Sequence, residues 1–463
     1  MSVILKHNFN SLSPEEQQQY QVMAESLLAK DRSDSLSAAT LTKLWRDKGL
    51  VEQGASKDNN PAERFLKKCE KLDLVKIERQ NGGGRKGNVV TLKYYAYTGT
   101  PLQGTVPWQH PLYIKRNADS DCERWLNDGI MPQKTRIFLK IKSPRYTGKT
   151  SLLIRLKQFL KDTKIAVAFV DLESCKFTDQ LFTDRISEKT KSDNLTEFLR
   201  VFQAVVVEEF RPYIRAGLQS VSGFSTNISP GVALTNDLEC KVFNLIEKPK
   251  VLFIDGIDRI LGSSIQDSFF RILRTWSEEK MKKIENQSFP NWPNIVMAFS
   301  TESYFDRESP LQNIGTDIKL NPFTEDHILG LAQLYGLEWN NDSIVENANT
   351  LKKLLGGNPY LINMALTEMS RENIDVKTLH KKAFSPDSFF LKHLRKIGEM
   401  INQKEDLKST LCHWLSDHSF YLDEKSKLQL AKLGVIEFDS QNKPKISCQL
   451  YEEYFQQFCS ISH

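Results

Sequence analysis

The amino-acid sequence predicts an α/β core, a parallel sheet with helices on both faces, followed by a helical segment and flanked by two small domains. Three observations indicate this architecture. Apolar runs that suit fully buried parallel strands alternate with helical stretches, and they lie at residues 137–141, 165–171, 251–255 and 295–299. Residues 324–369 have helical periodicity. Small helices precede a strand pair near both ends of the chain.

The two terminal domains have the pattern of winged helices. Near the start we expect helices at 13–28, 38–48 and 61–71, then strands at 74–79 and 88–95 around a basic glycine-rich tip, G-G-G-R-K-G at 82–87. Near the end, helices precede a hairpin at 435–438 and 445–450. The predicted domains are therefore 1–97, a linker at 98–112, a core at 113–322, a helical lid at 323–385 and a C-terminal winged helix at 386–463.

Composition narrows the functional classes. The 463 residues suggest about three domains, and the 40% hydrophobic and 26% charged content is ordinary for a globular protein. The formal net charge of +5 is too small to indicate nucleic-acid binding by the whole chain. The longest apolar run, 165–170, is far too short to span a membrane, so we expect no membrane partner.

Cysteine usage and the first residues favour a cytoplasmic protein. The seven cysteines are scattered without a C-x-x-C pair, which argues against a disulfide framework or a zinc ribbon. We expect some of them, such as Cys240, to be small buried hydrophobes. The first residues lack the apolar core of a signal peptide.

A phosphate-binding loop is indicated at 143–150, where S-P-R-Y-T-G-K-T fits G-x-x-x-x-G-K-[ST] apart from serine at the first glycine. It follows an apolar strand and begins a helix, whose amide groups and dipole attract phosphate. An ordinary strand–turn–helix is the alternative. The motif predicts a P-loop that binds ATP or ADP with Mg²⁺. The expected contacts are Ser143, Pro144, Arg145, Tyr146, Thr147, Gly148, Lys149, Thr150 and Ser151.

Acidic and hydroxyl residues follow two other predicted strands. Asp255 ends the run V-L-F-I-D, where Mg²⁺ is usually held through water, so Thr150 and Asp255 are the expected metal residues. Asp258 is a candidate for orienting or activating water, and Thr301 for sensing the γ-phosphate. The alternatives are a solvated turn at Asp258 and a helix cap at Thr301. Lys149, Asp255, Asp258 and Thr301 are the predicted catalytic residues. Because no glutamate follows Asp255, we expect slow turnover.

Several short segments, in this order, resemble the AAA-like ATPases of the STAND class of signalling NTPases, which are abundant in cyanobacteria. They are Y-I-K-R-N-A-D at 113–119, the P-loop, L-F-I-D-G-I-D at 252–258, F-F-R-I-L-R-T-W at 269–276, F-S-T-E-S-Y at 299–304, N-P-F-T at 321–324, G-G-N-P-Y at 356–360 and L-Y-E-E-Y-F at 450–455. The sequence departs from the family at Ser143 and at Tyr146, where glutamine is usual. It also lacks the long C-terminal repeat array of many STAND sensors.

The resemblance implies a P-loop NTPase core, a helical lid and a winged helix that switch between an ADP-bound closed state and an ATP-bound oligomer. It places Asn358 and Pro359 of the lid near the base or ribose. It also implies a winged-helix histidine near the β-phosphate, for which His393 is the best placed candidate. A histidine packed in the core is the alternative.

The N-terminal domain lies outside the resemblance and carries a local basic cluster. Its members lie on the third helix and the wing, and they include Arg64, Lys67, Lys68, Arg85 and Lys86. Such a cluster suits phosphate contacts with duplex DNA, and a solvated face of a protein–protein adaptor is the alternative.

Together these features predict an ATP-binding, slowly hydrolysing switch whose nucleotide state controls homo-oligomerisation and engagement of DNA or a protein partner. Two other functions are consistent with the same residues. One is a DNA-loading AAA+ regulator of the transposition or replication type. The other is an adaptor that binds nucleotide without hydrolysing it.

Overall fold

The computed structural model forms two compact units, which are described separately. The first contains Met1–Ile114, Phe323–Lys396 and Cys448–Leu450, and the second contains Lys115–Pro322, Ile397–Ser447 and Tyr451–His463. The structure describes residues 11–28, 33–36, 38–50, 60–72, 74–78, 88–92, 104–108, 110–130, 137–162, 165–182, 188–214, 228–283, 292–300, 310–337, 339, 343–439 and 441–460. None of the helices in these ranges is long and apolar enough to cross a membrane.

The N-terminal part of the first unit packs three helices against a small antiparallel sheet. The elements are α2 (Pro14–Leu28), β1 (Ser33–Leu36), α3 (Ala38–Asp47), α4 (Asn60–Lys71), β2 (Val75–Glu78) and β3 (Asn88–Leu92), with strand order β1-β3-β2. The Ser13 hydroxyl accepts from the Glu16 amide and the Glu16 carboxylate accepts from the Ser13 amide, a capping box that begins α2. The buried rings of Trp45 and Phe65 meet edge to face at 5.1 Å.

The predicted helices and strand pair of this region are present, and β1 is an addition that the sequence did not predict. Its four residues, S-D-S-L, are too short and polar to form a recognisable strand pattern. The predicted wing tip, residues 82–87, lies outside the described residues, and so do Arg85 and Lys86.

The remainder of the first unit is helical, as predicted for residues 324–369. It contains α10 (Glu325–Leu334), α11 (Ile344–Leu355), α12 (Pro359–Glu372), α13 (Val376–Lys382) and the first half of α14 (Phe389–Asn402). Thr324 and His327 form a capping box at the start of α10.

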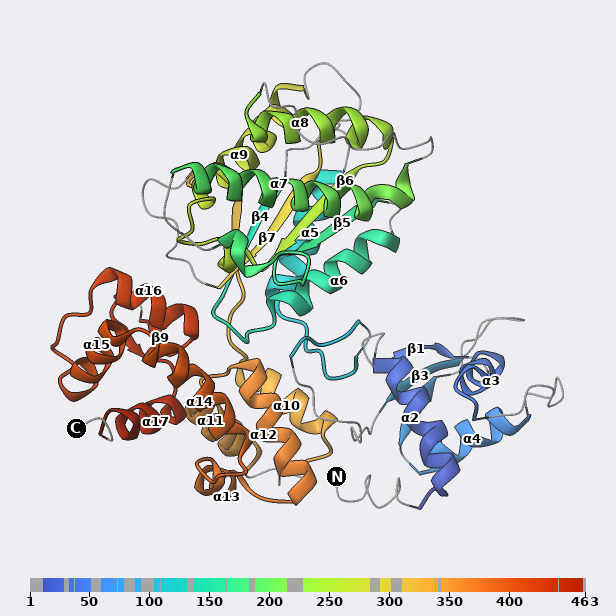
Figure 1. Cartoon of the computed structure of the whole chain (residues 1–463). Coiled ribbons are helices and arrows are strands. Elements are labelled where there is room, and N and C mark those ends of the chain that lie inside the picture. The colour runs from blue at the N-terminus through green and yellow to red at the C-terminus, as the bar shows by residue number, and fades with distance from the viewer. Residues whose placement is uncertain are drawn as a thin grey trace. The chain divides into compact units, whose positions relative to one another are not determined.

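The second unit is built on a five-stranded parallel sheet with the order β5-β6-β7-β4-β8. Its strands β4, β5, β6 and β7 are labelled in Figure 1. The strands are β4 (Phe138–Lys142), β5 (Ala166–Asp171), β6 (Lys250–Asp255), β7 (Asn294–Phe299) and β8 (Thr316–Lys319). The helices are α5 (Asn117–Ile130), α6 (Lys149–Asp162), α7 (Glu188–Phe210), α8 (Pro230–Lys241) and α9 (Gln266–Lys283). Single-turn 3₁₀ helices lie at Asp179–Phe182, Arg211–Tyr213, Phe243–Leu245 and Ile257–Arg259.

Each face of this sheet has its own apolar core. Leu252 and Ile254 face the core formed with α7, α8 and α9, whereas Val251 and Phe253 face the core formed with α5 and α6. Strands buried on both faces have near-continuous apolar runs, which is why the four runs could be recognised in the sequence. The sheet, its helices on both faces and the P-loop position confirm the predicted α/β P-loop NTPase fold.

The C-terminal part of the second unit contains the end of α14, α15 (Glu405–Ser416), α16 (Glu424–Leu433), the hairpin β9 (Ile436–Phe438) and β10 (Pro444–Ile446), and most of α17 (Gln449–Ser460). The two strands pair antiparallel with Ile446 opposite Ile436, close to the predicted hairpin.

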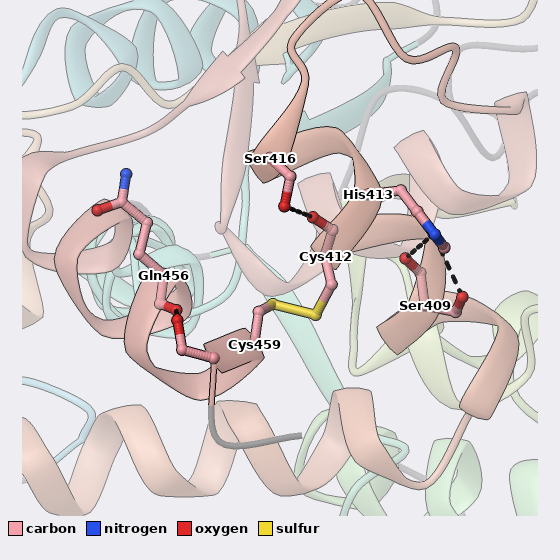
Figure 2. The surroundings of a disulfide bond; sticks show 7 residues. Ser409, Cys412, His413, Ser416, Gln456 and Cys459 are labelled. Carbon is pink, nitrogen blue, oxygen red and sulfur yellow. Dashed lines mark hydrogen bonds between the residues drawn. A yellow bond between two sulfur atoms is a disulfide. The ribbon is translucent and has the colours of Figure 1, made fainter. Parts of the chain in front are cut away.

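One cysteine pair was not predicted, and the expectation about Cys240 is wrong. Cys412 of α15 and Cys459 of α17 form a disulfide, 47 residues apart in the sequence (Figure 2). The fold brings these helices together, and spacing along the chain carries no signal of such a pair. Cys240, expected to be buried, is exposed on α8.

Candidate nucleotide-binding site

The predicted P-loop connects the carboxyl end of β4 to the first turn of α6. Ser143, at the position of the motif's first glycine, is buried, and its hydroxyl donates to the Leu320 carbonyl at 2.9 Å. Ser143 is not among the residues with positive φ, so the turn does not need glycine there. The left-handed positions are instead Tyr146, with φ 64°, and Gly148, with φ 92°. The loop therefore turns without its first glycine, at the cost of a left-handed tyrosine.

Arg116 supports this loop from outside the motif, and sequence reasoning gave it no role. Its buried guanidinium donates to the Thr147 carbonyl at 2.9 Å and to the Asn321 carbonyl at 3.3 Å. A Cβ at Gly148 would lie 3.1 Å from the same guanidinium and would crowd it, and the positive φ of Gly148 favours glycine there. The segment Y-I-K-R-N-A-D at 113–119 is the signal in the sequence, and its resemblance to the family does not by itself reveal this role.

Lys149 is the first residue of α6, and its side chain contacts the backbone of the loop. Its Nζ donates to the carbonyl oxygens of Ser143 at 2.9 Å and Pro144 at 2.8 Å. Burial lowers the pKa of Lys149 to about 8, against the opposing charges of Asp258 and Asp255. A partly desolvated ammonium in this position gains from an anion placed beside it.

Thr150 and Asp255, which were predicted from motifs about a hundred residues apart, are in direct contact. The Thr150 hydroxyl donates to Asp255 Oδ2 at 2.6 Å, and the Gly256 amide donates to Oδ1 at 2.9 Å. Burial raises the pKa of Asp255, Asp171 on the next strand adds to the rise, and the hydrogen bonds from Thr150 and Gly256 oppose it. Such a carboxylate would be stabilised by a cation.

This donor set fits Mg²⁺. Mg²⁺ is commonly held by one or two carboxylates and a hydroxyl together with phosphate oxygens and water, rather than by a cage of protein ligands. Within the described ranges, no group of three or more histidines, cysteines or carboxylates is arranged to hold a metal.

Asp258 lies on the 3₁₀ turn after β6 and is held by the residue that follows β7. Its Oδ1 accepts from the Ser300 amide at 2.9 Å, and its Oδ2 accepts from the Ser300 hydroxyl. Both carboxylate oxygens are therefore engaged. Thr301, the predicted γ-phosphate sensor, lies outside the described residues.

A residue of α16 also reaches the loop within this unit, and the sequence gave no sign of it. The Lys432 carbonyl accepts from the Arg145 amide at 3.2 Å, and Lys432 Nζ donates to the Asp258 carbonyl at 3.3 Å. Burial lowers the pKa of Lys432, and Asp258 opposes that shift. Because this contact joins segments far apart in the chain, no local motif could predict it.

The remaining predicted residues are buried or cap a helix. Ser151 is buried in the first turn of α6. In the first unit, Pro359 is buried at the start of α12, and the Asn358 side chain caps that helix by accepting from the amides of Tyr360 and Leu361. His393 is buried with its ring 5.2 Å from that of Tyr360, and burial lowers its pKa to about 4.

The predicted nucleic-acid residues on α4 are exposed. Arg64 and Lys67 lie on the exposed side of the helix. Lys68 is also exposed, but its Nζ forms an ion pair with Glu16 at 2.6 Å.

A family model described as the AAA-like domain matches residues 101–457, most of the chain. The chain belongs to this AAA-like family. The match begins in the predicted linker and contains the P-loop, Asp255 and the helical segment. No curated protein matches the sequence.

Solved structures of P-loop ATPases are similar at low identity. The Walker-type ATPase of Pyrococcus abyssi matches with a TM-score of 0.46 and 14% identity over 73% of this AAA-like chain and 95% of its own. The Aeropyrum pernix ORC2 protein, solved with ADPNP and ADP, matches with a TM-score of 0.39 and 14% identity over 75% of this chain and 93% of its own. The Thermotoga maritima RuvB Holliday junction branch migration motor matches with a TM-score of 0.35 and 14% identity over 74% of this chain and 95% of its own. At these scores the similarities carry no information on function.

Proposed function

We propose that this AAA-like protein is an ATP-binding molecular switch that hydrolyses ATP slowly and whose nucleotide state controls its assembly. The observation that carries the proposal is the 2.6 Å contact of the Thr150 hydroxyl with the buried Asp255 carboxylate, in the loop that also holds Lys149. These are a hydroxyl, a carboxylate and a cation of the kinds that bind a magnesium nucleotide.

Each residue has a distinct part in this proposal. Lys149 and the amides at the start of α6 bind the β- and γ-phosphates, which are the groups that a helix N-terminus and a buried ammonium favour. Thr150 and Asp255 hold Mg²⁺, which when bound would neutralise phosphate charge. Asp258, fixed by Ser300, orients water near the terminal phosphate.

The residue after Asp255 supports slow hydrolysis. Gly256 has φ 71°, and a Cβ there would lie 2.9 Å from Glu173 Cγ and 3.1 Å from the Glu173 amide nitrogen. Fast ATPases have a glutamate directly after the metal-binding aspartate. At position 256 a glutamate would be strained by the positive φ and crowded by Glu173, so this chain is not expected to use one there.

The second candidate, a DNA-loading regulator, is favoured by the exposed cations Arg64 and Lys67 on α4. The third candidate, an adaptor, would bind nucleotide without hydrolysing it, so a measurement of phosphate release from ATP distinguishes it from the switch.

A single variant tests the phosphate site. Lys149→Ala should weaken ATP binding by about 100-fold or more, because charge-assisted hydrogen bonds to two phosphates are lost. It should also abolish any ATP-dependent increase in mass. Titration calorimetry and light scattering with Mg²⁺ and ATP measure both. Lys161→Ala, which changes an exposed lysine near the other end of α6, is the control. Wild-type affinity in Lys149→Ala would refute the assignment.

A further inference from the structure

Glu173 lies beside Gly256, at the edge of the sheet where Asp255 ends β6. β5 and β6 pair in parallel register with Asp171 opposite Asp255, and Glu173 follows β5 by two residues. Its Cγ occupies the space next to Gly256 into which the first carbon of a side chain would project. The segment after the neighbouring strand therefore places an acidic side chain beside position 256, which has no side chain of its own.

The turn that carries Glu173 is fixed by hydrogen bonds. The Glu173 amide donates to the Asp171 carboxylate at 2.9 Å, and the Leu172 amide donates to the Asp255 carbonyl at 3.1 Å. The Arg259 guanidinium donates to the Leu172 carbonyl at 2.7 Å. The backbone of Glu173 is thus attached to both β5 and the turn after β6, so its position relative to Asp255 is set by the sheet.

The charge of Glu173 acts on the ammonium groups of Lys149 and Lys432. Together with Asp258 and Asp255, it opposes the lowering of the Lys149 pKa. It acts in the same direction on Lys432. The Glu173 carboxylate therefore interacts electrostatically with both ammonium groups, and one of them, Lys149, is the proposed ligand of the terminal phosphate.

Glu173 and Asp258 differ in how free they are to accept a proton. Both oxygens of Asp258 accept hydrogen bonds from Ser300. Glu173 is exposed, and among the described residues no hydrogen bond or ion pair of its carboxylate is found. A general base needs an unoccupied oxygen that can approach the attacking water, and Glu173 meets this requirement better.

We propose that Glu173 is the general base for ATP hydrolysis, in place of the glutamate that Gly256 excludes. The inference rests on the proposed function of the site. The Glu173 carboxylate takes a proton from water as the water oxygen bonds to the γ-phosphorus. The bond from that phosphorus to the β–γ bridging oxygen breaks, and ADP and inorganic phosphate leave. The proton then passes from Glu173 to solvent.

The isosteric variant Glu173→Gln separates catalysis from binding. A positioned base contributes on the order of 10²-fold or more, so single-turnover phosphate release should fall at least about 100-fold. ATP affinity should stay the same or become tighter, because a negative charge near the phosphates is removed. Glu197→Gln, an exposed carboxylate of α7, should change neither quantity. Thermal unfolding of each variant with and without ATP checks that the site remains folded.

Chemical rescue distinguishes a base from a structural residue. Formate should restore part of the phosphate release of Glu173→Ala, because a small carboxylate can occupy the space left by the side chain. A wild-type rate in Glu173→Gln, or a loss that formate does not relieve in Glu173→Ala, would overturn the role of Glu173. Wild-type protein that binds ATP without hydrolysing it would overturn this inference and favour the non-hydrolysing adaptor, while the nucleotide site would stand. Wild-type protein that binds no nucleotide would overturn the proposed function as well.

Discussion

Lys149 is a cation whose charge in the folded protein depends on what lies beside it. Burial lowers its pKa to about 8, so the ammonium is partly neutral in mildly alkaline solution. A bound phosphate favours the charged form and raises this pKa. Nucleotide binding should therefore take up protons above neutral pH, and affinity should fall as pH rises through about 8.

Calorimetry in buffers of different ionisation enthalpy measures this proton uptake. We expect it to increase as pH rises through about 8, because the neutral fraction of Lys149 grows. Burial also lowers the pKa of Lys432, so the titration is repeated with Lys432→Met, which should keep most of the uptake. Zero uptake over this range would contradict the shift at Lys149.

Residues of the site were predictable where the chemistry lies within a short motif. Lys149, Thr150 and Asp255 follow from strand–loop–helix patterns, and the structure brings them together. The left-handed φ of Tyr146 was not predictable, because the motif specifies residue types and not which of them turns the backbone. Arg116 and Glu173 were missed because their positions depend on the packing of other strands and helices.

Among the elements, β4 carries two buried cations beside the edge strand β8. Lys140 and Lys142 are both buried and form ion pairs with Asp317 at 3.0 and 2.5 Å. Burial raises the pKa of Asp317, but hydrogen bonds from Lys142 and Lys140 outweigh this effect and leave it below its usual value. The carboxylate thus stabilises the fold above the pKa that it has when unfolded, and this stability is lost as pH falls through the folded pKa.

Asp317→Asn should lower the free energy of unfolding of the second unit by about 1–2 kcal/mol at pH 7. Removing one partner from a buried ion pair costs more, but Asp317 is half exposed, and solvent screens its charge. Urea unfolding followed by the fluorescence of the buried Trp276 and Trp292 measures the change. The exposed pair of Asp121 and Arg124 provides a control, since Asp121→Asn should change stability by less than about 0.5 kcal/mol. Equal effects of the two substitutions would contradict the role of Asp317.

The same strands show why elements differ in how well a sequence predicts them. β4, β5, β6 and β7 are interior or strongly apolar strands, and their runs of hydrophobic residues were recognised. β8 reads T-D-I-K and β1 reads S-D-S-L, with polar residues that an edge position allows. Edge strands of this kind are defined by pairing with a neighbour, and their own composition carries little signal.

For the whole molecule, the net charge of +5 in 463 residues provides no general attraction for nucleic acid, so any binding has to be local. Local clustering is seen on α4, where Arg64 and Lys67 are exposed. Lys68 contributes less than the sequence suggested, because its ion pair with Glu16 neutralises part of its charge. Its charge and hydrogen bond also lower the pKa of Glu16.

The DNA-loading candidate therefore makes a quantitative prediction about α4. Two cations that contact phosphates release about two counterions, so the double variant Arg64→Ala with Lys67→Ala should weaken duplex binding. It should also flatten the plot of log affinity against log salt concentration by about two units. Fluorescence anisotropy with a labelled duplex between about 50 and 200 mM salt covers the range where this slope is measurable. Neither residue is an evident reader of base edges, so duplexes of different sequence should respond alike.

The control removes the same charge from another exposed helix of the first unit. Lys377→Ala with Lys381→Ala on α13 lowers the net charge equally and should leave the salt slope unchanged. Neither double variant should alter ATP affinity, because neither changes a residue of the phosphate site. If the α13 variant weakens DNA binding as much as the α4 variant, the attraction belongs to the overall charge and not to α4. If the unaltered protein binds no duplex at low salt with either ADP or ATP, the DNA-loading candidate is wrong. The exposed face of α4 would then belong to another partner.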